Sequence, residues 1–228
     1  MSEHNKNILK YIDSSVQRQT DEIYEILLLT KYCKLGGLVQ LLNDRLSLNP
    51  TSARLQENEV IKMFCDICEG LAELHRNGII HRDLKIENIL IDSEMDKKRG
   101  APDPNSINYV LCDFGSATTK IFDRRLTKSA QQIQLVVDEI QKYTTLSYRS
   151  PEMVDLYSNK LITTKSDIWA MGCLLYKICY FQMPFGESQL AIQEGRFTIP
   201  DAKANYFSKK LNSLISMISI VLYKKMIS

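Results

Sequence analysis

The sequence has almost no charge excess, only 3 histidines and no long hydrophobic run. Its 228 residues include 29 lysines and arginines against 27 aspartates and glutamates, for a formal net charge of +2. Because the two signs balance, electrostatics give no reason to expect nucleic acid or an anionic membrane as the main partner. The longest apolar patch near the C-terminus, residues 214–222, is interrupted by two serines and falls far short of the ~20 residues of a membrane-spanning helix. We therefore expect no nucleic-acid partner and no transmembrane segment.

The sequence also lacks the marks of secretion and of a zinc site. Residues 1–7 are polar and contain no apolar run of the kind found in signal peptides, so we expect a cytoplasmic location and reduced cysteines. Cys65 and Cys68 form a C-x-x-C pair that could bind zinc, but no second pair and no spaced histidines follow. The pair falls within an apolar helical stripe, which favours core packing over a metal site.

What is present is an ordinary globular composition, with 44% hydrophobic and 25% charged residues. These values exclude collagen-like, coiled-coil and disordered chains. The length suits one large domain or two small ones with a substantial buried core.

Apolar periodicity predicts two long helices. Apolar residues recur at spacings of three and four between Glu59 and Asn77, and Gly78 is the expected stop. Residues 166–181 are apolar nearly all round, which places a second helix at the centre of the core. A short helix is expected at residues 38–42, directly after Gly36 and Gly37.

Short apolar runs predict strands. Residues 8–11 and 23–29 are expected to form two strands, joined by a turn at the polar residues 17–22. Further strand pieces are expected from the runs 79–80, 89–91 and 109–112. The segment 92–108 is rich in charge, proline and glycine and predicts an exposed insertion.

Four motifs follow one another in the second half of the chain. They are His-Arg-Asp-Leu-Lys-Ile-Glu-Asn at 81–88, Asp-Phe-Gly at 113–115, Ser-Pro-Glu at 150–152 and Asp-Ile-Trp-Ala-Met-Gly at 167–172. Each one alone is weak, but their order and their position beside strand pieces make a strong signal. The alternative, a set of unrelated loop carboxylates with a buried histidine, would need four coincidences.

This set of motifs resembles the protein kinases. The resemblance implies an α+β, protein-kinase-like fold that consists mostly of the helical C-lobe with a remnant of the N-lobe sheet. It implies that Asp83 orients the substrate hydroxyl or accepts its proton, and that Lys85 offsets charge on the moving phosphoryl group. It also implies ATP and Mg2+ as cofactors, with Asn88 and Asp113 as the metal ligands.

The same resemblance assigns further roles around the site. Lys31, Tyr32 and Cys33 become the hinge whose backbone binds adenine, and Leu90 lies beneath the adenine ring. Asp167, at the start of the central helix, is expected to accept backbone N–H groups of the catalytic loop.

Two features favour serine and threonine as acceptors. Lys85 follows Asp83 by two residues, and Thr145 precedes Glu152 by seven, which are the spacings of serine/threonine kinases. Thr145 is then expected to hydrogen-bond Asp83 and Lys85 as part of the catalytic set; the alternative is a threonine on an exposed loop. Arg82 adds a pattern linked to activation by loop phosphorylation, for which Thr127, Ser129 and Thr144 are the candidate acceptors.

Longer runs resemble the numb-associated kinases, and their adaptor-associated branch in particular. The runs span residues 11–15, 110–118, 138–140, 142–149, 173–177 and 184–188. This resemblance implies a helical activation segment after Phe122, and phosphorylation of a threonine on the medium subunit of the clathrin adaptor complex. It further implies a role in endocytosis and a location in the cytoplasm, with peripheral association at clathrin-coated membranes.

The resemblance also has gaps. It divides the chain into residual N-lobe strands and hinge (1–34), a C-lobe (35–213) and a divergent tail (214–228). No G-x-G-x-x-G loop and no V-A-I-K strand occur, and no arginine follows Ser213 to pair with Glu152. We therefore expect severely reduced catalysis from the chain as written. The alternatives are a catalytically inactive fragment that serves as a binding or scaffold protein, and a chain that does not fold stably.

Overall fold

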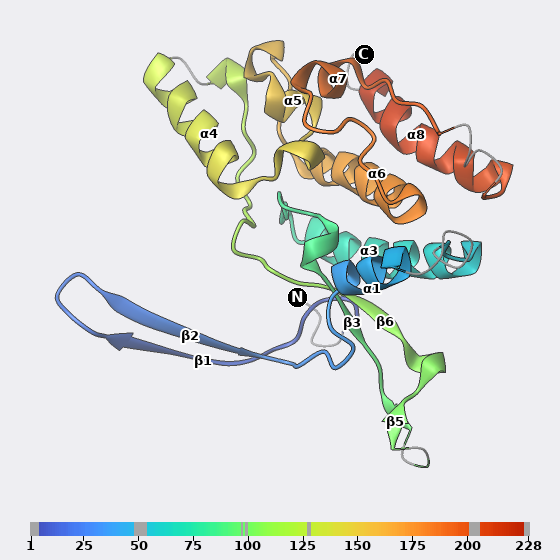
Figure 1. Cartoon of the computed structure of the whole chain (residues 1–228). Helices are drawn as coiled ribbons and strands as arrows, with labels where there is room; N and C mark the ends of the chain where they lie inside the picture. The colour runs from blue at the N-terminus through green and yellow to red at the C-terminus, as the bar shows by residue number, and fades with distance from the viewer. Residues whose placement is uncertain are drawn as a thin grey trace.

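The computed structural model describes residues 5–47, 54–96, 98, 100–126, 129–200 and 206–225. Figure 1 shows a helical body from which two β-hairpins project. The helices are α1 (Leu38–Ser47), α3 (Glu57–Arg76), α4 (Ala130–Tyr143), α5 (Pro151–Val154), α6 (Thr164–Tyr180), α7 (Gln189–Glu194) and α8 (Lys209–Lys225). The strands are β1 (Tyr11–Arg18), β2 (Tyr24–Thr30), β3 (Ile89–Asp92), β4 (Met95–Asp96), β5 (Ala101–Pro102) and β6 (Asn108–Leu111).

The described strands form three separate antiparallel pairs, β1 with β2, β3 with β6 and β4 with β5. In the β3–β6 pair, Ile89 lies opposite Leu111 and Asp92 lies opposite Asn108. The Ile89–Leu111 end of this pair is the end that adjoins residues 81–88. The structure combines helices, which predominate, with short strands. This agrees with the expected α+β class. The division of the chain at residues 34 and 213 stays a prediction.

Helix α6 forms the centre of the body. Most of its residues are buried, as its lack of a polar face predicted. Trp169 stacks on Phe185 with ring centroids 5.1 Å apart, and Tyr180 donates a hydrogen bond to Asn212 of α8 at 2.7 Å. Because both ends of α6 are packed, its first turn is a fixed platform for the catalytic loop.

Helix α3 confirms the long helix predicted between Glu59 and Asn77, within two residues at either end. Gln56 and Glu59 form a capping box at its start. Its end is set by Gly78, whose φ of +69° is a left-handed conformation that favours glycine. The buried side of α3 includes Val60, Met63, Ile67, Leu71 and Leu74.

Several predicted boundaries are wrong. The first strand was expected at residues 8–11, but β1 runs from Tyr11 to Arg18 and takes in polar residues that were assigned to the turn. Pairing with β2, not burial, sets this strand, because every residue of both strands is exposed. Ile8 is instead buried and forms an isolated parallel bridge with Leu111. The short helix predicted at 38–42 continues to Ser47 as α1.

One further expectation needs correction. Residues 79–80 do not form a strand; Ile80 makes an isolated bridge with Thr118. The segment 92–108, predicted to be an exposed insertion, contains the short β4–β5 hairpin. The helix expected after Phe122 is confirmed by α4. Within the described residues, no helix has the length and apolarity required to cross a bilayer.

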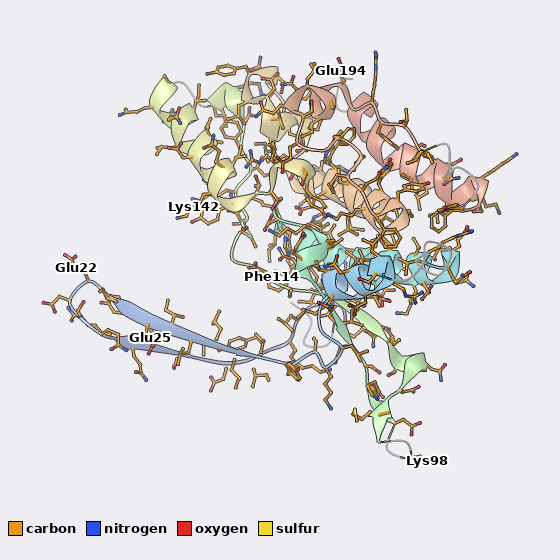
Figure 2. All side chains as sticks on the ribbon, in the orientation of Figure 1. Glu22, Glu25, Lys98, Phe114, Lys142 and Glu194 are labelled. Carbon is orange, nitrogen blue, oxygen red and sulfur yellow. The ribbon has the colours of Figure 1, made fainter. Side chains whose placement is uncertain are left out.

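The β1–β2 hairpin stands apart from the body. Figure 2 shows its side chains spread along both faces, with Glu22 and Glu25 toward its far end. Its exposed apolar side chains are Tyr11, Ile12, Val16, Ile23, Tyr24, Ile26, Leu27, Leu28 and Leu29. Among the described residues neither strand has a second neighbour, so both outer edges are unpaired.

The segment before this hairpin is fixed to the body at Asn7. The Asn7 carbonyl accepts a hydrogen bond from Leu111 N at 2.8 Å, and its side-chain amide donates to Tyr109 O at 3.0 Å. Gly70 of α3 lies against it so closely that a Cβ at this position would be 2.5 Å from the Asn7 carbonyl oxygen. Glycine is therefore required here by close packing.

Gly70→Ala should lower the free energy of unfolding by about 1–3 kcal/mol, the usual cost of overpacking, although alanine favours helices by about 1 kcal/mol. Urea denaturation measures the change, with Cys65→Ala on the exposed side of the same helix as the control. A Gly70→Ala protein as stable as the parent would contradict the close contact.

Candidate active site

The catalytic loop, residues 81–88, joins the end of α3 to β3. Its last turn is a 3₁₀ helix at Ile86–Asn88, and the loop enters through reciprocal hydrogen bonds between the backbones of Ile80 and Thr118. Asn88 O accepts a hydrogen bond from Cys112 N at 3.0 Å, so the loop ends beside the Asp113–Gly115 motif. The fold thus brings the first two sequence motifs to the same end of the β3–β6 ladder.

Asp83 is the centre of a polar network. One carboxylate oxygen accepts a hydrogen bond from Thr145 Oγ1 at 2.7 Å, and the other lies 2.7 Å from Lys85 Nζ. Lys85 Nζ also donates to Thr145 Oγ1 at 3.1 Å, which closes a triangle of three side chains. Asn88 Nδ2 donates to the Asp83 carbonyl at 2.8 Å. The structure therefore brings together Asp83, Lys85, Asn88 and Thr145, and Thr145 is half-buried rather than on an exposed loop.

This network keeps Asp83 ionised. Partial burial by itself would raise the pKa of its carboxyl, but hydrogen bonds from Lys85, Thr145 and Asn88 and the Lys85 charge outweigh it, so the pKa is lowered. A carboxylate with this protonation state can accept a hydrogen bond from a hydroxyl at neutral pH.

Asp167 fixes the backbone of the loop to helix α6. Its carboxylate accepts hydrogen bonds from His81 N at 2.8 Å and from Arg82 N at 2.9 Å, and it pairs with His75 Nε2 at 2.8 Å. Arg82 has a φ of +69°, an unfavourable conformation for a residue with a side chain. The carboxylate holds this strained turn in place, because both of the N–H groups it accepts from lie at the turn.

His81 supports the loop from inside the core. Burial lowers the pKa of its imidazole despite the nearby Asp167, so the ring is neutral. Its Nε2 lies 3.2 Å from the Cys112 carbonyl, which can only accept, so the proton is assigned to Nε2. Phe114 packs edge-on against His81 with ring centroids 5.5 Å apart, so the ring of the Asp113–Gly115 motif contacts the catalytic loop.

Asn88 and Asp113 supply hard oxygen donors at one edge of the site. Asp113 is exposed and has a φ of +61°, which turns the chain at the end of β6. A carboxylate and an amide oxygen are the donor types that suit Mg2+, which keeps water and phosphate oxygens as its other ligands. The residues present therefore fit the metal in kind. Among the described residues no cluster of three or more His, Cys, Asp or Glu forms a closed metal site.

The hinge residues lie where β2 runs into α1. Lys31 N donates to Lys10 O at 2.9 Å, while its side chain pairs with Asp92, which raises the pKa of the lysine. Cys33 is buried and Tyr32 is exposed. Leu90 on β3 bridges to Gly37, so the hinge and the predicted adenine floor are close along the ladder. Their binding of adenine stays a prediction.

Sequence reasoning missed several functional contacts. The Lys31–Asp92 pair joins residues 61 positions apart, and Glu139 of α4 pairs with Arg82 across 57 positions. Arg149 Nε donates to Thr144 Oγ1 at 2.7 Å, which ties the end of α4 to the segment carrying Thr145. No spacing rule predicts the Lys31–Asp92 and Arg82–Glu139 pairs; the only signal for α4 was the resemblance that predicted a helix after Phe122.

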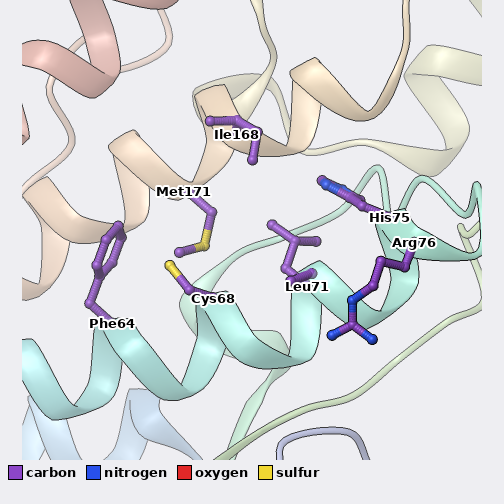
Figure 3. Close-up of a pocket in the computed structure, with 8 residues that line it drawn as sticks. Phe64, Cys68, Leu71, His75, Arg76, Ile168 and Met171 are labelled. Atoms are coloured by element: carbon purple, nitrogen blue, oxygen red, sulfur yellow. The ribbon is translucent and has the colours of Figure 1, made fainter. Parts of the chain in front are cut away.

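A separate apolar cavity of about 590 Å³ lies between α3 and α6, away from the Asp83 network. Figure 3 shows Phe64, Cys68 and Leu71 facing Met171 and Ile168 across it. Cys68 lines the cavity, and burial raises the pKa of its thiol to about 11. Cys65 is exposed, so the prediction that both cysteines pack in the core is wrong for Cys65.

Glu152 is a buried carboxyl that is poorly compensated. Only 1% of the residue is exposed, and neither oxygen has a hydrogen-bond partner among the described residues. Burial is the largest influence on the pKa of Glu152 and raises it, while the nearby Ser150 and Lys160 act in the opposite direction.

A family model described as the protein kinase domain matches residues 1–227, so the chain belongs to the protein kinase family. Serine/threonine-protein kinase sel-5 of Caenorhabditis elegans is 43% identical over 197 residues, which cover 86% of this chain and 17% of that protein. Actin-regulating kinase PRK1 and actin-regulating kinase 1, both of Saccharomyces cerevisiae, are each 38% identical and cover 94% and 93% of this chain. The chain spans 24% and 31% of the length of these two relatives.

Asp167→Asn should reduce the free energy of unfolding by about 2–4 kcal/mol, because the amide offers one acceptor oxygen where the buried carboxylate accepts from two backbone N–H groups and pairs with His75. Chemical denaturation checks this, with Asp138→Asn on the exposed side of α4 as the matched control. A loss smaller than about 0.5 kcal/mol, which is typical of surface changes, would show that Asp167 does not hold the loop.

Glu152→Gln should stabilise the protein at alkaline pH. Because the folded pKa of Glu152 is raised, its favourable contribution is present below the unfolded value and is lost as pH rises through the folded pKa. At about pH 8 the variant should therefore gain about 1–3 kcal/mol, the cost of a buried unpaired polar group. The gain should shrink on acidification. Glu194→Gln, which changes an exposed carboxylate, is the control; a gain that is equal at all pH values would contradict the assignment.

Proposed function

We propose that this chain carries the hydroxyl-orienting and metal-binding half of a serine/threonine kinase site, which transfers the ATP γ-phosphoryl group to protein hydroxyls. The observation that carries the proposal is the closed triangle of Asp83, Lys85 and Thr145. Three side chains from two distant segments converge there with the charge pattern that phosphoryl transfer needs.

In the proposed reaction the acceptor oxygen forms a bond to the γ-phosphorus while the bond to the β–γ bridging oxygen breaks and ADP leaves. Asp83 accepts a hydrogen bond from the acceptor hydroxyl, orients its lone pair and receives the proton as the new bond forms. Lys85 offsets the negative charge of the moving group. Asn88 and Asp113 would hold Mg2+, which neutralises phosphate charge when bound.

Serine and threonine are the proposed acceptors. The Thr145 hydroxyl donates to Asp83 and accepts from Lys85, which is the arrangement that the resemblance to serine/threonine kinases implies. The relatives named serine/threonine kinases support this choice.

The proposed biological setting is the regulation of clathrin adaptors in endocytosis, with the adaptor medium subunit as the substrate. The support is the resemblance of residues 138–149 to the numb-associated kinases, together with relatives named actin-regulating kinases. The proposed location is the cytoplasm, with peripheral association at coated membranes.

In a full-length version of the protein, which would include a Gly-rich loop and a strand lysine, Asp83→Asn should lower phosphorylation of a threonine peptide from the adaptor medium subunit by about 10²- to 10⁴-fold, the usual contribution of a general base. Affinity for Mg-ATP should stay near that of the parent chain, because Asp83 faces the hydroxyl. Radiometric assay and calorimetry measure the two quantities, and Asp138→Asn controls for a charge change on the surface.

Turnover of Asp83→Asn within about tenfold of the parent would remove Asp83 from this role. A parent chain that binds the adaptor peptide, but neither binds Mg-ATP nor transfers phosphate, would instead support the binding-protein alternative.

A further inference from the structure

The β1–β2 hairpin exposes a large apolar surface to solvent. Every residue of its two strands is exposed, and nine large apolar side chains between residues 11 and 29 are among them. Contiguous apolar surface of this kind marks an interaction site on a globular protein. An isolated two-stranded hairpin is also only marginally stable in water, so a further paired strand would stabilise it.

The two outer edges of the hairpin differ in their capacity to accept another strand. Strand β1 carries both Asp13 and Arg18, and most of its other residues are polar. Charged side chains on an edge strand oppose pairing with another strand. Strand β2 reads Tyr-Glu-Ile-Leu-Leu-Leu-Thr, with Glu25 as its one charged residue. The edge of β2 is therefore the one that favours pairing.

Strand β2 is apolar on both of its faces. Side chains alternate along a strand, so Ile26 and Leu28 lie on one face and Leu27 lies on the other with Leu29. Val16 of β1 lies opposite Ile26 and extends the first of these faces. A continuous apolar run is typical of a strand in the interior of a sheet. Strand β2 thus has the composition of an interior strand but the position of an edge strand.

The sequence of β2 is complementary to itself in one antiparallel register. When Leu28 lies opposite Leu28 of a second copy, Leu27 lies opposite Leu29 of that copy. The same register places Glu25 opposite Lys31 of the second copy, and two-fold symmetry produces this pair twice. Apolar and opposite-charge pairs directly across two strands are the pairs that stabilise a sheet.

Lys31 is available for this contact. Its backbone N donates to Lys10 O at 2.9 Å, so the ladder continues past the end of β2. Its ammonium pairs with Asp92, but the side chain is 54% exposed and the group has three N–H donors. A second carboxylate can therefore approach it from solvent.

We propose that two copies of this chain associate through the edges of their β2 strands, which pair in antiparallel register about Leu28 to form a four-stranded sheet of order β1–β2–β2–β1. The same surface of each copy takes part, so the assembly closes at two copies. The hairpin stands apart from the helical body, and antiparallel pairing places the two bodies at opposite ends of the sheet (Figure 1). Tyr24 and Glu25 of one copy then lie beside the predicted hinge of the other.

Sedimentation equilibrium of the whole chain over a range of concentrations tests the proposal. The parent chain should show a reversible equilibrium between a 26.2 kDa monomer and a dimer of twice that mass. Leu28→Lys places two lysines directly opposite each other at the two-fold axis, so it should weaken association by at least about tenfold. Val16→Lys, the matched control, changes an exposed apolar residue on the same face of β1 and should dimerise like the parent.

The proposed register is tested by charge and by cross-linking. Glu25→Lys places a lysine opposite Lys31 at two positions of the dimer and should weaken association by about tenfold, whereas Asp13→Lys makes the same charge change on β1 and should have little effect. Under mild oxidation Leu28→Cys should form a disulfide between copies, because the two residues lie opposite each other at the axis. Val16→Cys and the parent, whose exposed Cys65 sets the background, should not.

A parent chain that remains a monomer at high micromolar concentration would overturn the proposal. Assembly beyond a dimer would overturn it too, because it would show that the charged edge of β1 also pairs. A dimer that Leu28→Lys leaves intact, or Leu28→Cys copies that do not link, would contradict pairing about Leu28. All of these measurements are independent of phosphoryl transfer, so they stand even if the proposed function fails.

Discussion

The structure depends on one buried carboxylate. Asp167 lies at the start of the central helix α6, is 1% exposed, and accepts hydrogen bonds from two consecutive backbone N–H groups of the catalytic loop. These bonds hold Arg82 in a left-handed conformation that its side chain disfavours. Because of this turn, His81 points into the core, Arg82 points toward α4 and Asp83 points toward Thr145. The packed helix α6 therefore determines, through Asp167, where the polar side chains of the catalytic loop lie.

Three charged side chains of the site each have polar or oppositely charged partners. Asp167 is matched by backbone N–H groups and His75, Asp83 by Lys85 and Thr145, and Arg82 by Glu139. The pKa of Asp83 is lowered despite partial burial because its hydrogen bonds favour the charged form. Glu152 is the exception, since burial raises its pKa more than the nearby Ser150 and Lys160 lower it. The free energy of unfolding therefore depends on pH through Glu152, whereas Asp83 stays ionised at neutral pH.

The sequence was sufficient to predict the parts of the fold that obey local rules. Periodicity located α3 and α6 to within two residues at each end, and motif order located Asp83, Lys85, Asn88 and Asp113. It misplaced β1, because an exposed hairpin carries no burial pattern and its register is set by its partner strand. It could not find Glu139 or Asp92, since their roles come from pairs about sixty residues apart. The adenine-binding role of Lys31, Tyr32, Cys33 and Leu90 stays a prediction.

We propose that the catalytic loop and the Asp113 motif form one site that binds Mg2+ and orients the acceptor hydroxyl. A crystal structure of the chain with Mg2+ and a non-hydrolysable ATP analogue should show a metal ion ligated by the Asn88 amide oxygen and the Asp113 carboxylate, with the γ-phosphate facing Asp83 and Lys85. A nucleotide bound elsewhere, or a metal that avoids both residues, would contradict this proposal.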